Sequence, residues 1–441
     1  MTLAYREEEL LKMVDADKGV VDRRMFFDED IYQLELERIF ARAWNFMCHD
    51  SQIPNPGDFF MTFIGEDRVI VVRDNEMQPQ VLINSCRHRG NAVCRAEEGH
   101  STSFMCTYHG WTYDLKGNLV GVPGFKEVYH EELDRENWGL IRAAQVDTYK
   151  GFVFACMDAD APPLPEYLGE VGRLGISYLA NRGSIKMIGG VQKFTIPCNW
   201  KLAVDNLFDW YHVGISHGAA ILAGVAGPNV KMSLTSELNK EHFVMLGDYG
   251  HAVGGPKYND YQKEFAKKMG FDESWRERPE VKAEMGDVAL RSMGHPSIFP
   301  NLWVTESNQM SLRIPKGPHK TEIWWFTFFE TEMSPEQFKH RLSFVNHIFG
   351  PAGQLEQEDG ENWGESTRGT RGVVSQRYPL NYAMNLKRGA VQREEGGPPF
   401  IEAVVNEHGQ LWTYRAWADW MAAETWNDLK ANHTQIPQDF A

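Results

Sequence analysis

The stretch CRHRGNAVCRAEEGHSTSFMCTYHGW, residues 86–111, decides the fold of the first part of the chain. It holds two loops that each pair a cysteine with a histidine, Cys86-x-His88 and Cys106-x-x-His109, with seventeen residues between them. Runs rich in β-branched and aromatic residues flank them, such as DFFMTFI (58–64) and KGFVFACM (150–157), separated by Gly, Pro, Asn and Asp. Such runs predict short strands joined by turns, so we expect a small all-β domain over residues 42–160.

The two loops together offer two thiolates and two imidazoles. A Rieske [2Fe–2S] cluster needs this set, because two His replace two Cys on one of its irons. A Cys2His2 zinc site is the alternative, although zinc sites more often pair Cys with Cys and His with His along the chain. Gly110 follows the second His directly, and a small residue lets backbone N–H groups approach a cluster. The pattern therefore favours the iron–sulfur cluster.

The remaining chain divides around this β-rich segment. The run IYQLELERIFARAW (31–44) has apolar residues at helical spacing, and we expect residues 1–41 to be a helical segment that packs on the catalytic domain. The acidic, proline-rich stretch DADAPPLPEYLG (158–169) predicts a domain boundary. Beyond it, helical runs such as SPEQFKHRLSFVNHIFG (334–350) mix with strands such as TEIWWFTFFE (321–330). We expect an α+β domain over residues 161–441.

Composition limits the class of protein. A chain of 441 residues predicts two domains, and its net charge of −16 argues against binding to nucleic acid or to an anionic membrane surface. The N-terminus, MTLAYREEELLKMV, lacks the basic and apolar regions of a signal peptide, and no apolar run is long enough to span a membrane. Six scattered cysteines are too few for a disulfide scaffold. We therefore expect a cytoplasmic protein.

A second pair of histidines, His212 and His217, lies in the run DNLFDWYHVGISH (205–217). Two His and one carboxylate form the facial triad that holds Fe(II) and leaves positions open for other ligands. Residues five apart on an ideal helix point about 140° away from each other, so the helix must end or be distorted between them. Gly214 is suitably placed for that distortion. Ordinary helix residues are the alternative, but an upstream electron-transfer cluster favours a metal site that accepts its electrons.

The carboxylate of such a triad is left open by spacing. It could be local, or it could come from the acidic cluster EQEDGE at 356–361, which follows the turn glycines Gly350 and Gly353. By spacing alone, each of the four acids there is an equal candidate for the carboxylate ligand. The alternative interpretation is an acidic helix start, where carboxylates complement the helix dipole.

Four motifs resemble the α subunits of Rieske ring-hydroxylating dioxygenases, on the biphenyl and naphthalene dioxygenase side of that family. They occur in order and cover most of the chain: Cys-x-His-x17-Cys-x-x-His-Gly-Trp (86–111), Asn-Trp-Lys (199–201), Asn-x-x-Asp-x-Tyr-His-x4-His (206–217), and Phe-Gly-Pro-Ala-Gly with Glu-Gln-Glu-Asp-Gly-Glu-Asn-Trp (349–363). Two positions depart from the family. Asp205 stands where relatives commonly have Glu, and Glu358 where many have a second Asp.

The resemblance implies roles for individual residues. The cluster ligands would be Cys86, His88, Cys106 and His109, and the iron ligands His212, His217 and Asp359, the last ten residues after Phe349. Asp209 would be a bridging acid between the two metal centres. The family fold is a Rieske β domain joined to a catalytic domain with a curved antiparallel sheet flanked by helices. Three such chains assemble as a homotrimer, α3, often with three small β subunits, α3β3.

The resemblance also implies a reaction and its partners. NADH electrons would pass through a reductase, usually with a ferredoxin, to the cluster and then to Fe(II), where O2 and an aromatic substrate give a cis-dihydrodiol in aromatic hydrocarbon catabolism. A monooxygenase or demethylase on the same metals is the main alternative. A pure electron carrier would leave the second His pair unused. A basic group near the cluster loops is either solvated surface charge or a docking patch for an acidic electron donor: Arg87, Arg89, Arg95 and Lys116.

Substrate choice depends on the cavity walls. The candidates by motif are Asn206, Leu207, Phe208, Val213, Phe349 and Leu355. Only Asn206 is polar, which favours a neutral aromatic substrate. An aromatic carboxylate would need an Arg or Lys in the cavity, and Arg313 is the nearest candidate.

Overall fold

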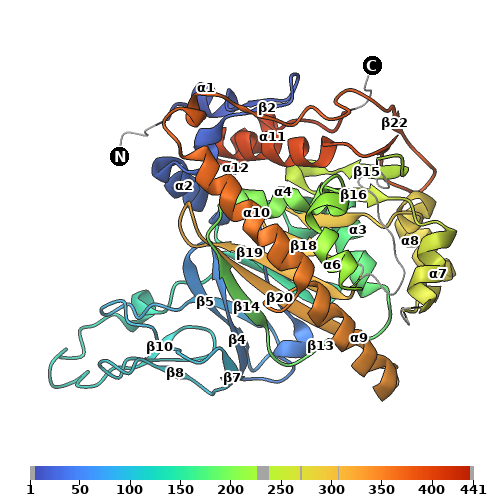
Figure 1. The fold of residues 1–441 in the computed structure, drawn as a ribbon. Helices are drawn as coiled ribbons and strands as arrows, with labels where there is room; N and C mark the ends of the chain where they lie inside the picture. Colours follow the sequence, from blue (N-terminus) through green and yellow to red (C-terminus); the bar gives the residue numbers. More distant parts are fainter. Residues whose placement is uncertain (1–4, 226–237, 269–270, 306, 438–441) are drawn as a thin grey trace. The chain divides into compact units, whose positions relative to one another are not determined.

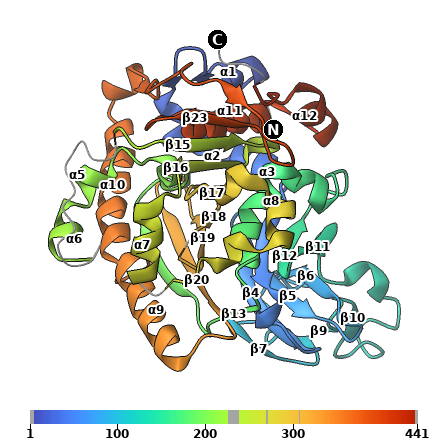
Figure 2. The same cartoon turned by 90° about the vertical axis from the view of Figure 1, so that its right-hand side faces the viewer.

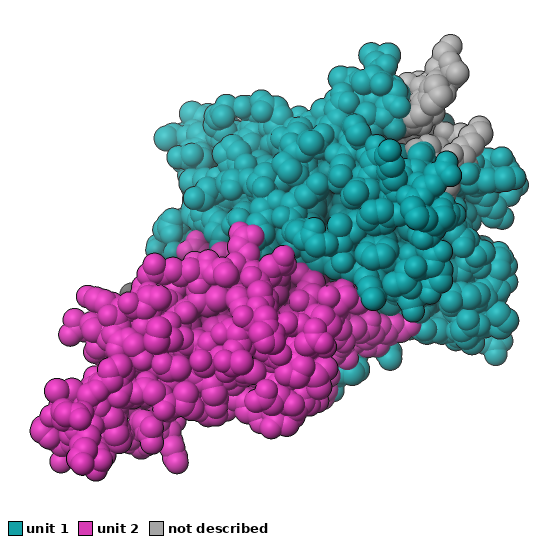
Figure 3. Space-filling model, turned by 90° about the horizontal axis from the view of Figure 1, so that it is seen from below, with its two compact units in different colours: residues 1–39, 165–441 teal, residues 40–164 magenta. Residues whose placement is uncertain are grey.

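The computed structural model describes residues 5–225, 238–268, 271–305 and 307–437, and Figure 1 shows its ribbon. The chain forms two compact units, one of residues 40–164 and one of residues 1–39 with 165–441 (Figure 3). The sequence had placed the ends of the β-rich domain at residues 42 and 160. The acidic, proline-rich stretch lies at the second junction, and its last residues already belong to the helix α3 (Leu164–Ala180).

The smaller unit consists of three antiparallel sheets with the strand orders β6-β5-β4-β7, β10-β9-β8 and β11-β12-β3. The strands are β3 (Asn45–His49), β4 (Asp58–Ile64), β5 (Asp67–Arg73), β6 (Pro79–Ile83), β7 (Glu98–His100), β8 (Phe104–Met105), β9 (Thr112–Tyr113), β10 (Leu119–Gly121), β11 (Gln145–Tyr149) and β12 (Phe152–Cys156). Two 3-10 turns accompany them, η3 (Asp50–Gln52) and η4 (Arg135–Trp138). Its core includes Cys86, Cys106 and Trp111, so the two Cys/His loops are anchored in packed apolar side chains.

The larger unit is built on a ten-stranded antiparallel sheet with the order β13-β20-β19-β18-β17-β16-β15-β23-β22, and β14 also pairs with β20. Its strands are β13 (Ile185–Met187), β14 (Gln192–Ile196), β15 (His242–Leu246), β16 (Ala252–Pro256), β17 (His295–Ile298), β18 (Leu302–Val304), β19 (Gln309–Pro315), β20 (Thr321–Glu330), β22 (Val391–Gln392) and β23 (Phe400–Ala403). Strand β19 is buried along its whole length although its sequence, QMSLRIP, alternates between polar and apolar residues, so its polar side chains lie inside the unit.

Helices flank this sheet (Figure 2). They are α3, α4 (Trp200–Asp205), α5 (Val213–Ser216), α6 (Gly218–Leu222), α7 (Asp260–Lys268), α8 (Pro279–Leu290), α9 (Pro335–Ile348), α10 (Gln354–Thr370), α11 (His408–Ala422) and α12 (Trp426–Asn432), with the shorter turns η5 (Asn206–Phe208), η6 (Asp248–Gly250), η7 (Ser274–Glu277) and η8 (Ser375–Arg377). Helix α10 contacts β14, and α11 contacts β15 and β16. A capping box of Ser334 and Gln337, followed by Pro335, begins α9 where the sequence predicts it. The expected combination of a small all-β domain and an antiparallel sheet flanked by helices is confirmed.

The N-terminal segment is less helical than expected. It contains α1 (Glu7–Leu11), the hairpin of β1 (Val14–Asp15) and β2 (Val20–Val21), then η1 (Arg23–Phe26), α2 (Glu29–Glu35) and the π-helical turn η2 (Leu36–Phe40). Gly19, with a φ of 62°, closes the hairpin, and β2 pairs with β21 (Leu380–Asn381). This turn is the physical reason why the helical prediction fails there. Helix α1 contacts α11, so the segment belongs to the larger unit.

No helix among the described residues is long and apolar enough to cross a membrane.

Candidate metal centres

The two Cys/His loops of the smaller unit are each closed by equivalent backbone hydrogen bonds. The Gly90 N–H donates to the Cys86 carbonyl at 2.8 Å, and the Gly110 N–H donates to the Cys106 carbonyl at 2.9 Å. The N–H groups of Cys86 and Cys106 donate in turn to the carbonyls of Asn91 and Trp111. Each cysteine therefore begins a short closed loop that also carries a histidine.

A glycine is required where each loop closes. Gly90 and Gly110 have φ values of 73° and 76°, a region that side chains other than glycine rarely adopt. A Cβ on Gly110 would also lie 2.8 Å from Cγ of Pro123. The Cys-x-His and Cys-x-x-His-Gly spacings therefore encode the backbone shape as well as the ligands.

The four donor atoms suit an iron–sulfur cluster. Cys86 and Cys106 are buried and form no disulfide, and the Nδ1 atoms of His88 and His109 lie 3.1 Å apart. Burial raises the pKa of Cys106, but the Asn91 amide, 3.5 Å from its sulfur, and nearby backbone N–H groups lower that pKa more, which favours the thiolate.

Tyr113 is a further group at this centre that the sequence analysis missed. Its hydroxyl lies 3.3 Å from Sγ of Cys86 and accepts a hydrogen bond from the Arg87 N–H. Hydrogen bonds to a cluster's sulfur ligands tune its potential. No motif in the sequence distinguishes Tyr113 from a core tyrosine.

A single zinc ion does not fit these four residues. It would draw all four donor atoms to one point, because zinc bonds are about 2.0–2.3 Å long. Within the described parts of the chain, the only group of three or more possible ligands whose donor atoms converge is that of His212, His217 and Asp359. In a [2Fe–2S] cluster the Cys pair and the His pair bind different irons and need not converge, so the zinc alternative fails.

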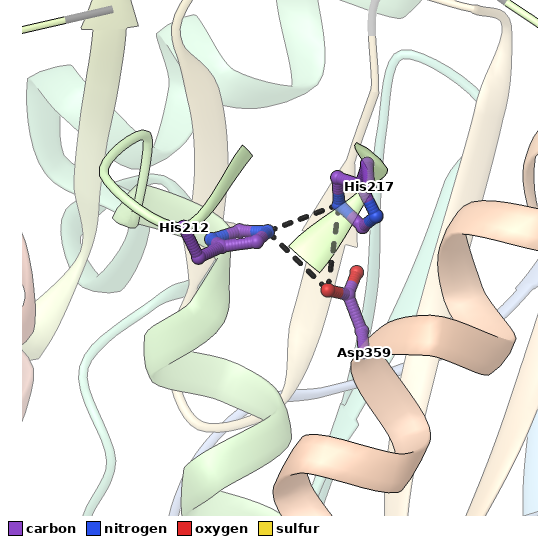
Figure 4. Close-up of side chains that lie close together, drawn as sticks. All are labelled: His212, His217 and Asp359. Atoms are coloured by element: carbon purple, nitrogen blue, oxygen red, sulfur yellow. Dashed lines mark hydrogen bonds and ion pairs between the residues drawn. The ribbon is translucent and has the colours of Figure 1, made fainter. Parts of the chain in front are cut away.

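The second centre lies in the larger unit, where His212, His217 and Asp359 face one another (Figure 4). The Nε2 atoms of His212 and His217 are 3.1 Å apart. Oδ1 of Asp359 lies 3.3 Å from Nε2 of His212 and 3.4 Å from Nε2 of His217. Three ligands at right angles around one ion, with bonds of about 2.0–2.2 Å, lie about 3 Å apart. Asp359 Oδ1 is also buried without a hydrogen-bond donor in the described chain. The site therefore fits a facially bound cation.

The helix ends where the two histidines require it to end. His212 is the residue before α5, and His217 is the residue after it, with non-helical backbone angles of −93° and 19°. Our expectation that Gly214 distorts the helix is wrong, because Gly214 lies inside α5 with a negative φ. The break at His217, before α6, turns its ring towards His212.

The structure distinguishes between the acids that residue spacing left as equal candidates for the carboxylate of the triad. Glu356 lies 3.6 Å from Arg313, Glu358 lies 3.0 Å from Nδ1 of His217, and Glu361 is exposed. Only Asp359 faces both Nε2 atoms. The local alternative fails for Asp205, whose carboxylate accepts hydrogen bonds from Tyr382 and Tyr414.

Asp209 lies on the other side of His212. Its Oδ2 is 3.4 Å from Nδ1 of His212, while its Oδ1 accepts hydrogen bonds from the N–H groups of Tyr211 and His212. Burial raises the pKa of Asp209, but the His212 ring and these backbone N–H groups outweigh it and keep the pKa below its usual value. Asp209 is therefore an anion that contacts the ring nitrogen that the cation site leaves unused.

A cavity of about 250 Å³ opens on the triad. Five of the six predicted wall residues line it: Asn206, Leu207, Val213, Phe349 and Leu355. Phe208 is a correction. It is buried against Gly254 and Gly409 and packs with Val244 and Trp412, because neighbouring residues of the turn η5 point in different directions.

Other walls of the cavity carry no motif in the sequence. They include apolar side chains from separate elements, namely Trp210, Ile221, Met293, Trp303, Phe344 and Ile348. Arg313 is not among them. Its side chain is 0% exposed, is paired with Glu356, and stacks against Trp303 and Trp325. It is therefore a structural cation behind the cavity and does not reach a substrate.

Two family models match the chain: the Rieske [2Fe-2S] domain over residues 43–146 and the ring hydroxylating alpha subunit (catalytic domain) over residues 178–423. The chain thus belongs to the family of ring-hydroxylating dioxygenase α subunits, a family of oxidoreductases. The expected cofactors, a Rieske [2Fe–2S] cluster and a mononuclear iron, are confirmed as those of the family's two domains.

Particular relatives span nearly the whole chain. The biphenyl dioxygenase subunit alpha of Metapseudomonas furukawaii is 35% identical, over 97% of this chain and 96% of the relative. The benzene 1,2-dioxygenase subunit alpha of Pseudomonas putida is 35% identical, over 97% of both chains. Among solved structures, naphthalene 1,2-dioxygenase with indole bound in the active site matches with a TM-score of 0.84 and 28% identity, over 95% of this chain and 96% of that one.

Proposed function

We propose that the protein is the terminal oxygenase of a multicomponent system that inserts both atoms of O2 into an aromatic ring to give a cis-dihydrodiol. The convergence of His212, His217 and Asp359 on an apolar cavity carries this proposal. Electrons would come from NADH through a reductase and, in most such systems, a ferredoxin. The names of the biphenyl, benzene and naphthalene dioxygenase relatives support an aromatic substrate and a dioxygenase outcome.

The geometry of the two sites supports the following assignment of metal ligands. Cys86 and Cys106 would hold one iron of the cluster and His88 and His109 the other, while His212, His217 and Asp359 would hold the mononuclear iron. When bound, that iron supplies oxygen activation with electrons from the cluster. The chain's own contribution is to present two Nε2 atoms and a carboxylate on one side and to leave the cavity side open.

The cavity walls place the arene and keep water out. Leu207, Val213 and Phe349 offer apolar contacts beside the triad, and Asn206 is the polar group on the same wall. Holding the ring edge at the site lowers the entropic part of the barrier. Excluding water also protects reactive species from side reactions.

Asp209 is proposed as a relay between metal centres of neighbouring chains. One carboxylate oxygen faces Nδ1 of His212 and the other accepts the N–H groups of Tyr211 and His212, and in a relay the carboxylate would also contact a second group. By resemblance to the family, that group is His109 of a neighbouring copy, in a homotrimer with or without small β subunits.

Electron-donor docking involves two exposed cations near the cluster loops. Of the four basic residues noted in the sequence, Lys116 pairs with Glu76 and Arg87 donates to the Gly139 carbonyl. Arg89 and Arg95 are exposed and remain available to an acidic donor protein.

Reconstitution tests the proposal. The purified oxygenase, a ferredoxin and reductase, NADH and biphenyl are combined under ¹⁸O2, and the product is analysed by mass spectrometry. Two labelled oxygens in a cis-dihydrodiol are expected. One labelled oxygen would favour the monooxygenase alternative, and no oxygenated product from any aromatic compound would reject the proposal.

A further inference from the structure

The cavity has a polar end as well as a metal end. Four of its lining residues form this polar end, namely Tyr258, Gln262, Glu273 and Arg276. Three of them, Tyr258, Glu273 and Arg276, also line a neighbouring outer groove to which no residue of the His212–His217–Asp359 triad contributes. The polar end is therefore the part of the cavity remote from the metal site.

Arg276 is held rigidly at this end. Its Nε donates to Glu273 at 2.8 Å, and its Nη1 donates to the carbonyls of Leu290 and Ser292. Its side chain is only 5% exposed. Its Nη2 makes no hydrogen bond to any described residue, although the side chain lines the cavity. This donor is therefore available to an acceptor oxygen of a ligand in the cavity.

Gln262 offers a second unused donor. The residue is 7% exposed, and its Oε1 accepts the N–H of Asn259 at 3.2 Å. Because a backbone N–H can only donate, this bond fixes which end of the amide is oxygen. Nε2 is then the group left over, and it has no acceptor among the described residues.

Tyr258 completes the set. Its ring lies under the Arg276 guanidinium, with 4.6 Å from the ring centroid to Cζ, and its hydroxyl makes no hydrogen bond to a described residue. The three unused groups, one each on Tyr258, Gln262 and Arg276, all include an N–H or O–H donor. The carboxylate of Glu273 at this end already accepts from Arg182 and Arg276, so an acceptor for the unused donors has to come from a ligand or from water.

The charges at the polar end are nearly balanced. Arg182 and Arg276 share the carboxylate of Glu273, at 2.9 and 2.8 Å, and Asp272 and Glu277 also interact with the groups of this end. The unused N–H and O–H donors therefore decide which ligand group fits. An oxygen acceptor, neutral or anionic, is favoured there, and a cationic group is disfavoured.

We infer that the substrate is an aromatic compound that carries a hydrogen-bond-accepting oxygen, as in an aryl carboxylate or aryl ketone, at the end remote from the ring edge that is oxidised. This inference rests on the proposed function, because it takes the metal end of the cavity as the place of reaction. Arg276, Gln262 and Tyr258 are then specificity-determining residues, and the apolar middle of the cavity holds the ring system.

Ligand binding tests this inference independently of turnover. Biphenyl, biphenyl-4-carboxylate and 4-acetylbiphenyl are titrated into the intact metal-loaded protein, and quenching of tryptophan fluorescence is followed, since Trp210 and Trp303 line the cavity. At least one oxygen-bearing compound is expected to bind about tenfold more tightly than biphenyl, because one hydrogen bond to a charged group contributes roughly that factor.

Two variants that leave the Arg276 contacts intact locate the effect. Gln262→Leu and Tyr258→Phe should each reduce the ratio of the affinity for the oxygen-bearing compound to the affinity for biphenyl by about three- to tenfold. Gln33→Leu, on the exposed surface of α2, is the matched control and should not change this ratio. Equal binding of all three compounds, or a preference unaffected by both variants, would overturn the inference. Binding with the expected preference but no ¹⁸O in any product would instead reject the proposed function.

Discussion

Glu358 and Asp359 are neighbours in the chain and face opposite nitrogens of one imidazole. Oε2 of Glu358 lies 3.0 Å from Nδ1 of His217, and Oδ1 of Asp359 lies 3.4 Å from its Nε2. Glu358 also accepts the N–H of Ala220 through its other oxygen. The carboxylate therefore holds the proton on Nδ1 and leaves the Nε2 lone pair for a metal.

Replacing the two acids should have different effects. Asp359→Ala should lose the mononuclear iron and all hydroxylation, because two imidazoles alone bind Fe(II) poorly, and should keep the Rieske absorption and EPR spectra. Glu358→Ala should lower iron affinity or activity by about 10- to 100-fold, since it removes only the partner of His217. Glu361→Ala, at an exposed position of the same helix, serves as the control. Iron retained in Asp359→Ala but lost in Glu358→Ala would show that the carboxylate is assigned wrongly.

Asp209→Asn should separate metal binding from catalysis. The amide nearly preserves the shape of the side chain but removes the negative charge beside Nδ1 of His212. Both metal centres should remain bound and reducible by dithionite, while O2-dependent product formation falls by at least about 100-fold. Full turnover in this variant, or full activity of a monomeric protein, would contradict the relay.

The purified protein should be brown and contain about three irons and two acid-labile sulfides per chain. The reason is that the cluster ligands and the triad are separate sets in separate units. Iron and sulfide analysis, with zinc measured in the same sample, checks this. Stoichiometric zinc without labile sulfide would be inconsistent with both assigned centres.

Iron binding to the triad should release a proton. Burial alone would lower the pKa of His212, but the carboxylates of Asp209 and Asp359 outweigh it and raise that pKa to about 10 in the absence of metal. Below that pH the ring is protonated, and a metal needs its nitrogen unprotonated. Anaerobic titration of protein depleted of mononuclear iron with Fe(II) in weak buffer at pH 8 should therefore release about one proton per chain.

The same argument fixes the direction of the pH dependence. The apparent affinity for Fe(II) should rise by about tenfold per pH unit between pH 7 and pH 9 and level off above pH 10. The absence of proton release, or an affinity independent of pH over this range, would mean that His212 is neutral before the metal binds.

The sequence predicts the cluster unit well because its information is local. Cys86, His88 and Gly90 lie within five residues, and one turn geometry determines where all three point. The α9 helix is equally local, since its capping box and proline mark its start. The sequence does not predict the hairpin of β1 and β2, because the apolar residues of a short, charged segment also fit the period of a helix.

The cavity could not be predicted to the same depth. Its walls come from elements far apart in the chain, and no period or spacing relates Gln262 on α7 to Trp303 on β18. Arg313 is the nearest candidate in the sequence for binding an aromatic carboxylate, yet it is paired with Glu356 behind the cavity. The arginine that does line the cavity, Arg276, lies in a stretch with many charges, SWRERPE (274–280), where nothing marks it as buried.

The length of the four-residue helix α5 determines how the rings of His212 and His217 are oriented relative to each other. It separates the two ligand histidines, and inserting or deleting one residue within it would turn His217 by about 100° and remove its ring from the triad. The side chains along it are less constrained, since Ile215 is 60% exposed and Val213 faces the cavity. Libraries that aim to change the range of accepted arenes should therefore randomise the identity of residues 213–216 and keep their number fixed.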